Sequence, residues 1–127
     1  MPKVLVVDDV VDNVELLADA LEDVGYEVLK AFSGIEALNI AGSSKPDVIM
    51  LDIMMPGIDG IEVCRRLKSN PKLKSIPVIM VSALGEDSDL KMGLEAGAQD
   101  YIIKPYNVSV ALSQVQIALT RGRSTAI

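Results

Sequence analysis

Residues 48–60 read VIMLDIMMPGIDG, and this stretch decides the fold. Its first four residues are apolar without alternation, which is typical of a strand buried on both faces of a parallel sheet. The run ends at Asp52, and the loop that follows contains one Pro and two Gly. In open parallel sheets ligands bind beyond the carboxyl ends of the strands. The stretch therefore predicts a central strand with a functional site at its end.

Four more apolar runs of strand length lie on either side of this one. Each of the five is followed by helical spacing or by helix start and stop signals, which indicates repeated strand-helix units. The expected strands are residues 3–7, 27–31, 47–51, 77–81 and 100–103. The pattern predicts an α/β fold of the (βα)5 type, a three-layer sandwich with right-handed crossovers.

The helices are expected from periodicity and caps. The apolar positions of the first are Val14, Leu17, Leu21 and Val24, before Gly25. Ser33 and Glu36 form a capping-box pattern at the start of the second helix. The other three are expected over 61–69, 86–96 and 108–120, the last capped by Asn107. We expect one domain over residues 1–120 and a short C-terminal tail over 121–127.

Composition excludes several function classes. The 127 residues include no His and a single Cys, Cys64, which removes His-based triads, His-ligated transition metals and disulfide frameworks. A net charge of −6 disfavours binding to nucleic acids or anionic membranes. Neither a signal peptide nor an apolar stretch long enough to span a bilayer is recognisable, so we expect a cytoplasmic protein.

Acidic and polar residues follow the predicted strands. Strand one is followed by Asp8 and Asp9, strand three by Asp52, strand four by Ser82, and strand five by Lys104 and Pro105. Carboxylates that converge at one sheet edge repel each other unless a cation is present. Hard oxygen ligands without His or Cys favour Mg²⁺. The edge thus offers a nucleophilic oxygen at Asp52, a metal site, a hydroxyl and an ammonium, the groups that phosphoryl transfer uses.

Four segments, taken in order, carry a family resemblance: VLVVDD, VIMLDIMMPGIDG, PVIMVSA and GAQDYIIKP. The chain resembles the receiver domain of bacterial two-component response regulators over roughly residues 3–120. The resemblance implies a flavodoxin-like sandwich whose parallel five-stranded sheet has the order 2-1-3-4-5.

The resemblance also implies roles for the site residues. Asp52 is the expected phosphoacceptor. The expected Mg²⁺ ligands are Asp9, Asp52 and the backbone carbonyl of Met54, with Asp8 acting through a metal-bound water. Ser82 and Lys104 are expected to bind the phosphoryl group, and Tyr101 to turn inward on activation. The Lys104–Pro105 peptide bond is expected to be cis.

The expected function is that of a stand-alone response regulator receiver. It would accept a phosphoryl group on Asp52 from a histidine kinase or a histidine phosphotransfer protein, in a Mg²⁺-dependent reaction. It would signal through phosphorylation-dependent binding of an effector protein and would not be a turnover enzyme. Because the chain lacks His, the phosphohistidine must lie on another molecule.

Two alternatives stay open. The chain could be the receiver portion of a hybrid histidine kinase or a multidomain regulator. It could instead be a Mg²⁺ phosphatase with an aspartyl nucleophile. Phosphatases resembling haloacid dehalogenases carry an Asp-x-Asp pair, whereas Asp52 is followed by Ile53 and Met54.

Apolar residues at the margins of two helices are candidate partner surfaces. Val11 and Leu16 would suit docking of a kinase helix, and Val110 and Ile117 an effector or a second copy in a homodimer. The alternative for all four is ordinary core margin. Residues Met54 and Leu84 flank the site and are expected to govern water access.

Gly93 interrupts the fourth predicted helix. A Gly in a helix interior costs about 1 kcal/mol relative to Ala. Gly93 therefore marks either an element that shifts on activation or a place of tight packing, and the sequence favours neither.

Overall fold

The structure, a computed structural model, describes residues 1–124, with side chains described through residue 120. The strands are β1 (Lys3–Val7), β2 (Glu27–Ala31), β3 (Val48–Asp52), β4 (Val78–Ser82) and β5 (Asp100–Ile103). The helices are α1 (Val11–Asp23), α2 (Gly34–Ser44), α3 (Gly60–Ser69), α4 (Asp87–Glu95) and α5 (Val108–Ser124). Strands and helices alternate throughout, as predicted.

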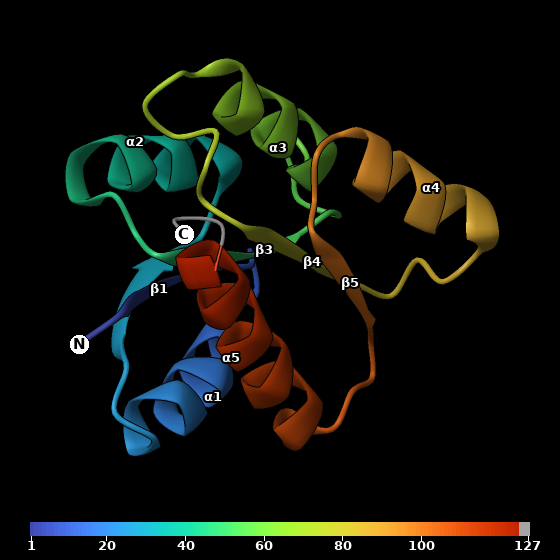
Figure 1. The fold of residues 1–127 in the computed structure, drawn as a ribbon. Helices are drawn as coiled ribbons and strands as arrows, with labels where there is room; N and C mark the ends of the chain where they lie inside the picture. The colour runs from blue at the N-terminus through green and yellow to red at the C-terminus, as the bar shows by residue number, and fades with distance from the viewer. Residues whose placement is uncertain (125–127) are drawn as a thin grey trace.

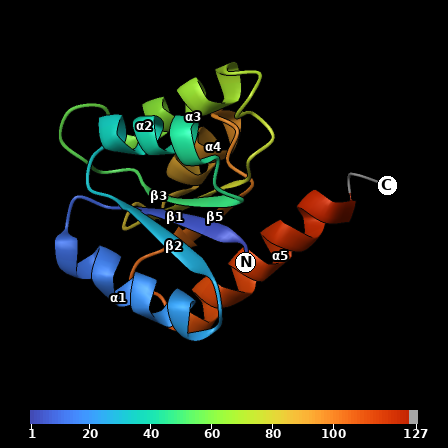
Figure 2. The same ribbon diagram turned by 90° about the vertical axis from the view of Figure 1, so that its left-hand side faces the viewer.

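All four strand pairs are parallel, and the sheet order is β2-β1-β3-β4-β5. Helices α2, α3 and α4 cover one face of the sheet, and α1 and α5 cover the other (Figures 1 and 2). The three-layer sandwich and the strand order are those expected.

Strands β3 and β4 each begin and end one residue later than predicted. Asp47 precedes β3, where its carboxylate accepts a 2.7 Å hydrogen bond from the Lys3 N–H. At the other end, Asp52 still pairs with Val81 of β4. Asp52 and Ser82 are therefore the last residues of their strands, and the sheet holds their backbones.

Each face of the sheet has its own hydrophobic core. Leu51 and Met80 point toward α2 and α3, while Met50 and Ile79 point toward α1 and α5. Because β3 and β4 are buried at every position, neither shows polar alternation.

Helix boundaries follow the predicted caps closely. The Ser33 side chain accepts from the Glu36 N–H at 3.1 Å, while the Glu36 carboxylate reaches the N–H of Phe32. The Asn107 side-chain oxygen Oδ1 accepts from the Ser109 N–H at 3.2 Å. Helix α5 continues four residues past the predicted end at 120, because Gly122 costs a helix only about 1 kcal/mol. Of the expected tail, residues 125–127 lie outside the described residues.

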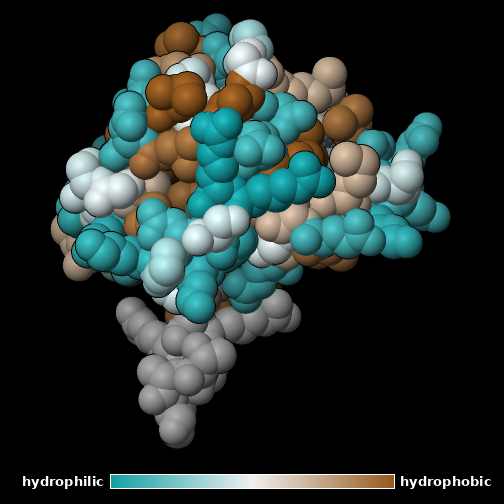
Figure 3. Space-filling model, turned by 90° about the horizontal axis from the view of Figure 1, so that it is seen from above, coloured by the Kyte–Doolittle hydropathy of each residue, from teal (hydrophilic) through white to brown (hydrophobic). Residues whose placement is uncertain are grey.

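The outer surface of the α2–α3–α4 layer mixes hydrophilic and hydrophobic side chains (Figure 3). Among the described residues, no helix has both the length and the apolarity needed to cross a bilayer.

Candidate functional site

The carboxyl ends of β1, β3, β4 and β5 meet at one edge of the sheet. In the parallel register Val7 pairs with Leu51, Asp52 with Val81, and Ser82 with Ile103. The residue after β1 and the residue after β5 therefore lie beside the ends of the two central strands. This register is what brings Asp8, Asp52, Ser82 and Lys104 together.

Three carboxylates form the centre of the site. Oxygens of Asp8, Asp9 and Asp52 all lie within 4.8 Å of one another. Asp8 and Asp52 are 5% and 6% exposed, whereas Asp9 lies open to solvent. Two of the three carboxylates are thus buried and the third faces solvent.

Donors from three elements fix the Asp8 carboxylate. It accepts from the Val10 N–H at 2.9 Å and from the Asn13 amide at 3.2 Å. The Lys104 ammonium donates to Oδ2, the oxygen that also accepts from Asn13, at 2.8 Å. Asn13, in the first turn of α1, was not predicted as a site residue. Its position on the face of α1 nearest the Asp pair was the available signal.

Lys104 joins two of the three carboxylates. Its Nζ lies 2.8 Å from Asp8 Oδ2 and 3.4 Å from Asp52 Oδ2. In this structure its closer partner is thus Asp8 rather than Asp52. The peptide bond between Lys104 and Pro105 is cis.

The two buried carboxyls have pKa values shifted in opposite directions. Burial is the largest influence on Asp52 and raises its pKa. The Lys104 ammonium and the Met54 N–H act to lower this pKa and the Asp8 charge acts to raise it, and the net shift is upward. Burial also acts to raise the pKa of Asp8, but its hydrogen bonds from Lys104 and Val10 outweigh burial and lower it. Of these two carboxylates, Asp52 is therefore the one whose negative charge Lys104 compensates less.

The donor set fits a hard divalent cation. Three carboxylates and one ammonium leave two negative charges unbalanced within one small cluster. Among the described residues, Asp9 has neither a hydrogen-bond nor an ion-pair partner for its carboxylate. Clustered oxygen donors without His or Cys are the ligands of Mg²⁺. Asp9 and Asp52 are the residues that would hold it. Ligation by the Met54 carbonyl and water-mediated contact with Asp8 stay predictions.

On the other side of Asp52, a short chain of hydrogen bonds runs from Ser82 to Tyr101. The fully buried Ser82 Oγ accepts from the Leu84 N–H at 3.2 Å. The Tyr101 hydroxyl donates to the Leu84 carbonyl at 2.6 Å. Burial raises the pKa of Tyr101, so this phenol stays protonated at neutral pH. The β4–α4 turn is therefore held at Leu84, through both its N–H and its carbonyl.

Gly57 and Gly60, in the loop after Asp52, have different structural roles. Gly57 has a φ of 80°, a turn conformation that L side chains rarely adopt. A Cβ on Gly60 would collide with the Asp52 carbonyl oxygen and lie 2.7 Å from Ile53 Cα. Gly60 therefore lets this loop approach the backbone of Asp52 itself.

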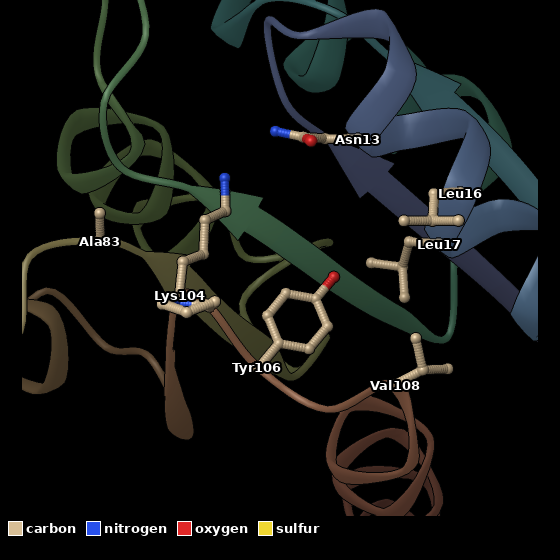
Figure 4. A pocket seen from close by; sticks show the side chains of 8 residues that line it. Asn13, Leu16, Leu17, Ala83, Lys104, Tyr106 and Val108 are labelled. Carbon is tan, nitrogen blue, oxygen red and sulfur yellow. The ribbon is translucent and has the colours of Figure 1, made fainter.

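An apolar pocket of about 380 Å³ adjoins the site (Figure 4). Leu16 and Leu17 reach into it from α1, and Val108 from the start of α5. Lys104 lines its other end, and the Tyr106 ring lies between them. Tyr106 was not predicted, because nothing local distinguishes it from any loop Tyr.

The residues expected at partner surfaces are exposed. Val11 and Leu16 are 54% and 67% exposed on α1, and Val110 and Ile117 are 44% and 41% exposed on α5. Met54 and Leu84 line a second pocket of about 390 Å³ over the far side of the site. The exposed pair on α1 and the exposed pair on α5 lie in the same helix layer, because both helices cover one face of the sheet.

Replacing Lys104 by Met should destabilise the protein by about 2 kcal/mol at neutral pH, because Asp8 and Asp52 lose their cation. The lowered pKa of Asp8 gives stability that is present at neutral pH and lost as the pH falls. Without Lys104 the carboxyls of Asp8 and Asp52 bind protons at a higher pH. The difference in free energy of unfolding between Lys104→Met and the unaltered protein should therefore shrink below about pH 4. Urea unfolding at several pH values measures this.

Lys91→Met, on the exposed face of α4, is the matched control, since its Nζ lies 3.9 Å from a single exposed carboxylate. Mg²⁺ should restore much of the stability that Lys104→Met loses. A loss that is equal at neutral and acidic pH would contradict the ion-pair explanation.

Comparison with known proteins agrees with this geometry. Residues 4–116 match the response regulator receiver domain family. The chain is 40% identical over 121 residues to the DNA-binding dual master transcriptional regulator RpaA of Synechocystis, covering 95% of this chain and 50% of RpaA. It therefore spans about half the length of that relative.

Solved receiver structures match almost end to end. The receiver domain of Francisella response regulator 1452 superposes with a TM-score of 0.90 at 35% identity, covering 95% of this chain and 98% of that one. The signal receiver domain of a histidine kinase from Syntrophus aciditrophicus gives 0.88 at 37% identity, covering 94% and 91%. A Mg²⁺ phosphatase of the haloacid dehalogenase type is thereby set aside. With its sheet order and its acidic cluster, the chain belongs to the response regulator receiver domain family.

Proposed function

We propose that this receiver accepts a phosphoryl group on Asp52 from a phosphohistidine, with Mg²⁺ as cofactor. The arrangement of Asp8, Asp9, Asp52 and Lys104 carries the proposal. It combines a buried carboxylate, two further oxygen ligands and one ammonium within contact distance. Few other reactions need a nucleophilic carboxylate beside a divalent-cation site without an imidazole.

In the transfer, a carboxylate oxygen of Asp52 forms a bond to phosphorus while the bond from phosphorus to the donor imidazole nitrogen breaks. The bound Mg²⁺ supplies neutralisation of the phosphoryl charge. Lys104 would exchange its contact with Asp52 for one with a phosphoryl oxygen, and the Ser82 hydroxyl would donate to another. Both groups already lie at the ends of adjacent strands, so little reorganisation is needed.

Water would later attack the phosphorus, releasing inorganic phosphate and restoring the Asp52 carboxylate. Met54 and Leu84 line the pocket through which that water approaches. The protein is thus a phosphoacceptor that resets itself, and one phosphoryl group passes through it per signal.

The signal itself is a population shift. Phosphoryl contacts with Ser82 and Lys104 favour an arrangement of the β4–α4 turn and Tyr101 that the free protein already samples. That arrangement binds an effector. The exposed Val110 and Ile117 of α5 are the proposed effector or dimer surface.

The test is incubation of the protein with acetyl phosphate. With Mg²⁺, intact mass spectrometry should find a species heavier by one phosphoryl group, and with EDTA it should not. Absence of that species with Mg²⁺ would overturn the proposal.

The kinase or phosphotransfer protein is proposed to dock on α1. Leu16 lies 67% exposed at the rim of the apolar pocket, whose other end is Lys104. A helix that brings its phosphohistidine to Asp52 would place an apolar side chain over this pocket. Docking and chemistry then share one edge of the molecule.

Leu16→Asp should therefore slow transfer from a phosphorylated histidine kinase by at least about tenfold, since it places a charge in an apolar contact. Phosphorylation by acetyl phosphate should stay within about twofold, because Leu16 is not part of the acceptor chemistry. Val24→Asp, 55% exposed at the far end of α1, should leave both rates unchanged. Equal slowing by both donors would exclude a docking role.

A second candidate is a receiver acting within a longer protein. It is favoured by the match to half of RpaA and by the likeness to a receiver taken from a histidine kinase. The chemistry proposed at Asp52 is the same in both cases. The output partner would then be a neighbouring domain.

A further inference from the structure

Helix α4 rests on the sheet through a glycine. Gly93 is the buried residue of this fully described helix, and its neighbours Met92 and Leu94 are 49% and 53% exposed. Most helices of globular proteins face the core with large apolar side chains. At its central contact, α4 instead presents bare backbone.

The group beneath that backbone is the Tyr101 ring. A Cβ on Gly93 would lie 3.1 Å from Cδ2 and 3.3 Å from Cε2 of Tyr101, and 3.5 Å from Cγ of Met80. Carbon atoms in favourable contact are about 3.5–4.0 Å apart. A methyl group at position 93 therefore requires the Tyr101 ring or the helix to move.

This contact extends the hydrogen-bond chain of the site. Ser82 Oγ accepts from the Leu84 N–H, and the Leu84 carbonyl accepts from the Tyr101 hydroxyl. The Tyr101 ring then lies under Gly93. Four residues thus connect the end of β4, beside Asp52, to the last turn of α4.

We propose that Gly93 is a positioning residue that provides the space for Tyr101 in the conformation seen here, with its hydroxyl bonded to the Leu84 carbonyl, which we take as the inward conformation, and that Gly93 so couples the phosphorylation site to α4. The proposal rests on the proposed function, because it assumes that phosphorylation favours inward Tyr101. Of the two readings of Gly93, the tight packing is observed, and in this proposal that contact would transmit the shift.

Gly93→Ala should push the Tyr101 ring aside by a few tenths of an ångström and weaken its hydrogen bond to Leu84. Loss of the inward state lowers the fraction of protein ready for phosphorylation, so the initial rate with acetyl phosphate should fall about fivefold. Gly42→Ala in α2 is the matched control, since a Cβ there has no atom within 4 Å. Its rate should equal that of the unaltered protein.

Tyr101→Leu makes the test specific. In this background Gly93→Ala should change the rate by less than about 1.5-fold, since the ring it displaces is gone. Equal slowing by Gly93→Ala with and without the Tyr101 ring would overturn the proposal. A merely structural role for Gly93 predicts that outcome.

A second readout needs no phosphorylation. In the unmodified protein, NMR should show nuclear Overhauser contacts between the Tyr101 ring protons and the Gly93 α-protons. In Gly93→Ala the ring resonances should shift toward those of an exposed Tyr. Retention of the ring in place would overturn the inference. If the unaltered protein resists phosphorylation while the ring still moves, the proposed function fails and the positioning contact stands.

Discussion

Asp52→Asn should raise the melting temperature of the metal-free protein by roughly 3–5 °C at neutral pH, about 1 kcal/mol. The reason is that burial and the nearby Asp8 charge raise the pKa of Asp52, so its ionised form is less stable folded than unfolded. The sign follows from linkage: a carboxyl with a raised pKa costs stability at neutral pH, and the cost disappears as the pH falls through that pKa. The gain should therefore vanish in acid.

The same substitution should abolish phosphorylation by acetyl phosphate and remove most of the stabilisation that Mg²⁺ gives. Scanning calorimetry with EDTA and with Mg²⁺ measures both effects on stability. Asp19→Asn makes the same charge change on the exposed face of α1 and should leave the response to Mg²⁺ intact. An Asp52→Asn protein that is less stable without metal, or that still binds Mg²⁺ fully, would refute the electrostatic description of the site.

Gly60→Ala should lower the free energy of unfolding by about 3 kcal/mol or more. Gly60 is the first residue of α3, and its N–H donates to the Ile53 carbonyl at 2.9 Å. A Cβ there would meet the Asp52 carbonyl oxygen, and would lie 2.9 Å from Asp52 C. All of these atoms belong to the backbone, so no side chain can turn aside. The strand end that carries Asp52 must shift.

Gly42→Ala is the control with the opposite sign. It fills empty space in α2 and should stabilise the protein by up to about 1 kcal/mol through helix propensity. Urea unfolding of the two variants compares a Cβ in contact with one in open space. A Gly60→Ala protein within about 1 kcal/mol of the unaltered one would show that the loop relaxes freely, contrary to a rigid support for Asp52.

Much of the fold was predictable because its signals are local. The apolar runs of β3 and β4 identify strands buried on both faces, and such strands require helices on both sides. The strand order came from the family resemblance rather than from periodicity. The predicted element boundaries were less accurate. Strand β3 begins after Asp47 rather than at it, and helix α5 continues through Gly122 rather than ending at residue 120.

The site was predictable as far as it lies at strand ends. Asp8, Asp52, Ser82 and Lys104 follow or end apolar runs, so topology alone brings them together. What the sequence could not provide are the supports, because they depend on how turns and helix starts fold back onto the strand ends, which no residue pattern encodes. Asn13 holds Asp8 from across a turn, and the spaces beside Gly60 and Gly93 exist only in the folded protein.

The central claim is that the Asp52 carboxylate becomes an aspartyl phosphate, and one measurement tests it directly. After reaction with acetyl phosphate and Mg²⁺, borohydride reduces an acyl phosphate to an alcohol, which converts the modified residue to homoserine. Peptide mass mapping should then find homoserine at position 52 and unmodified aspartate at positions 8 and 9. Homoserine at either of those positions, or at none, would contradict the account.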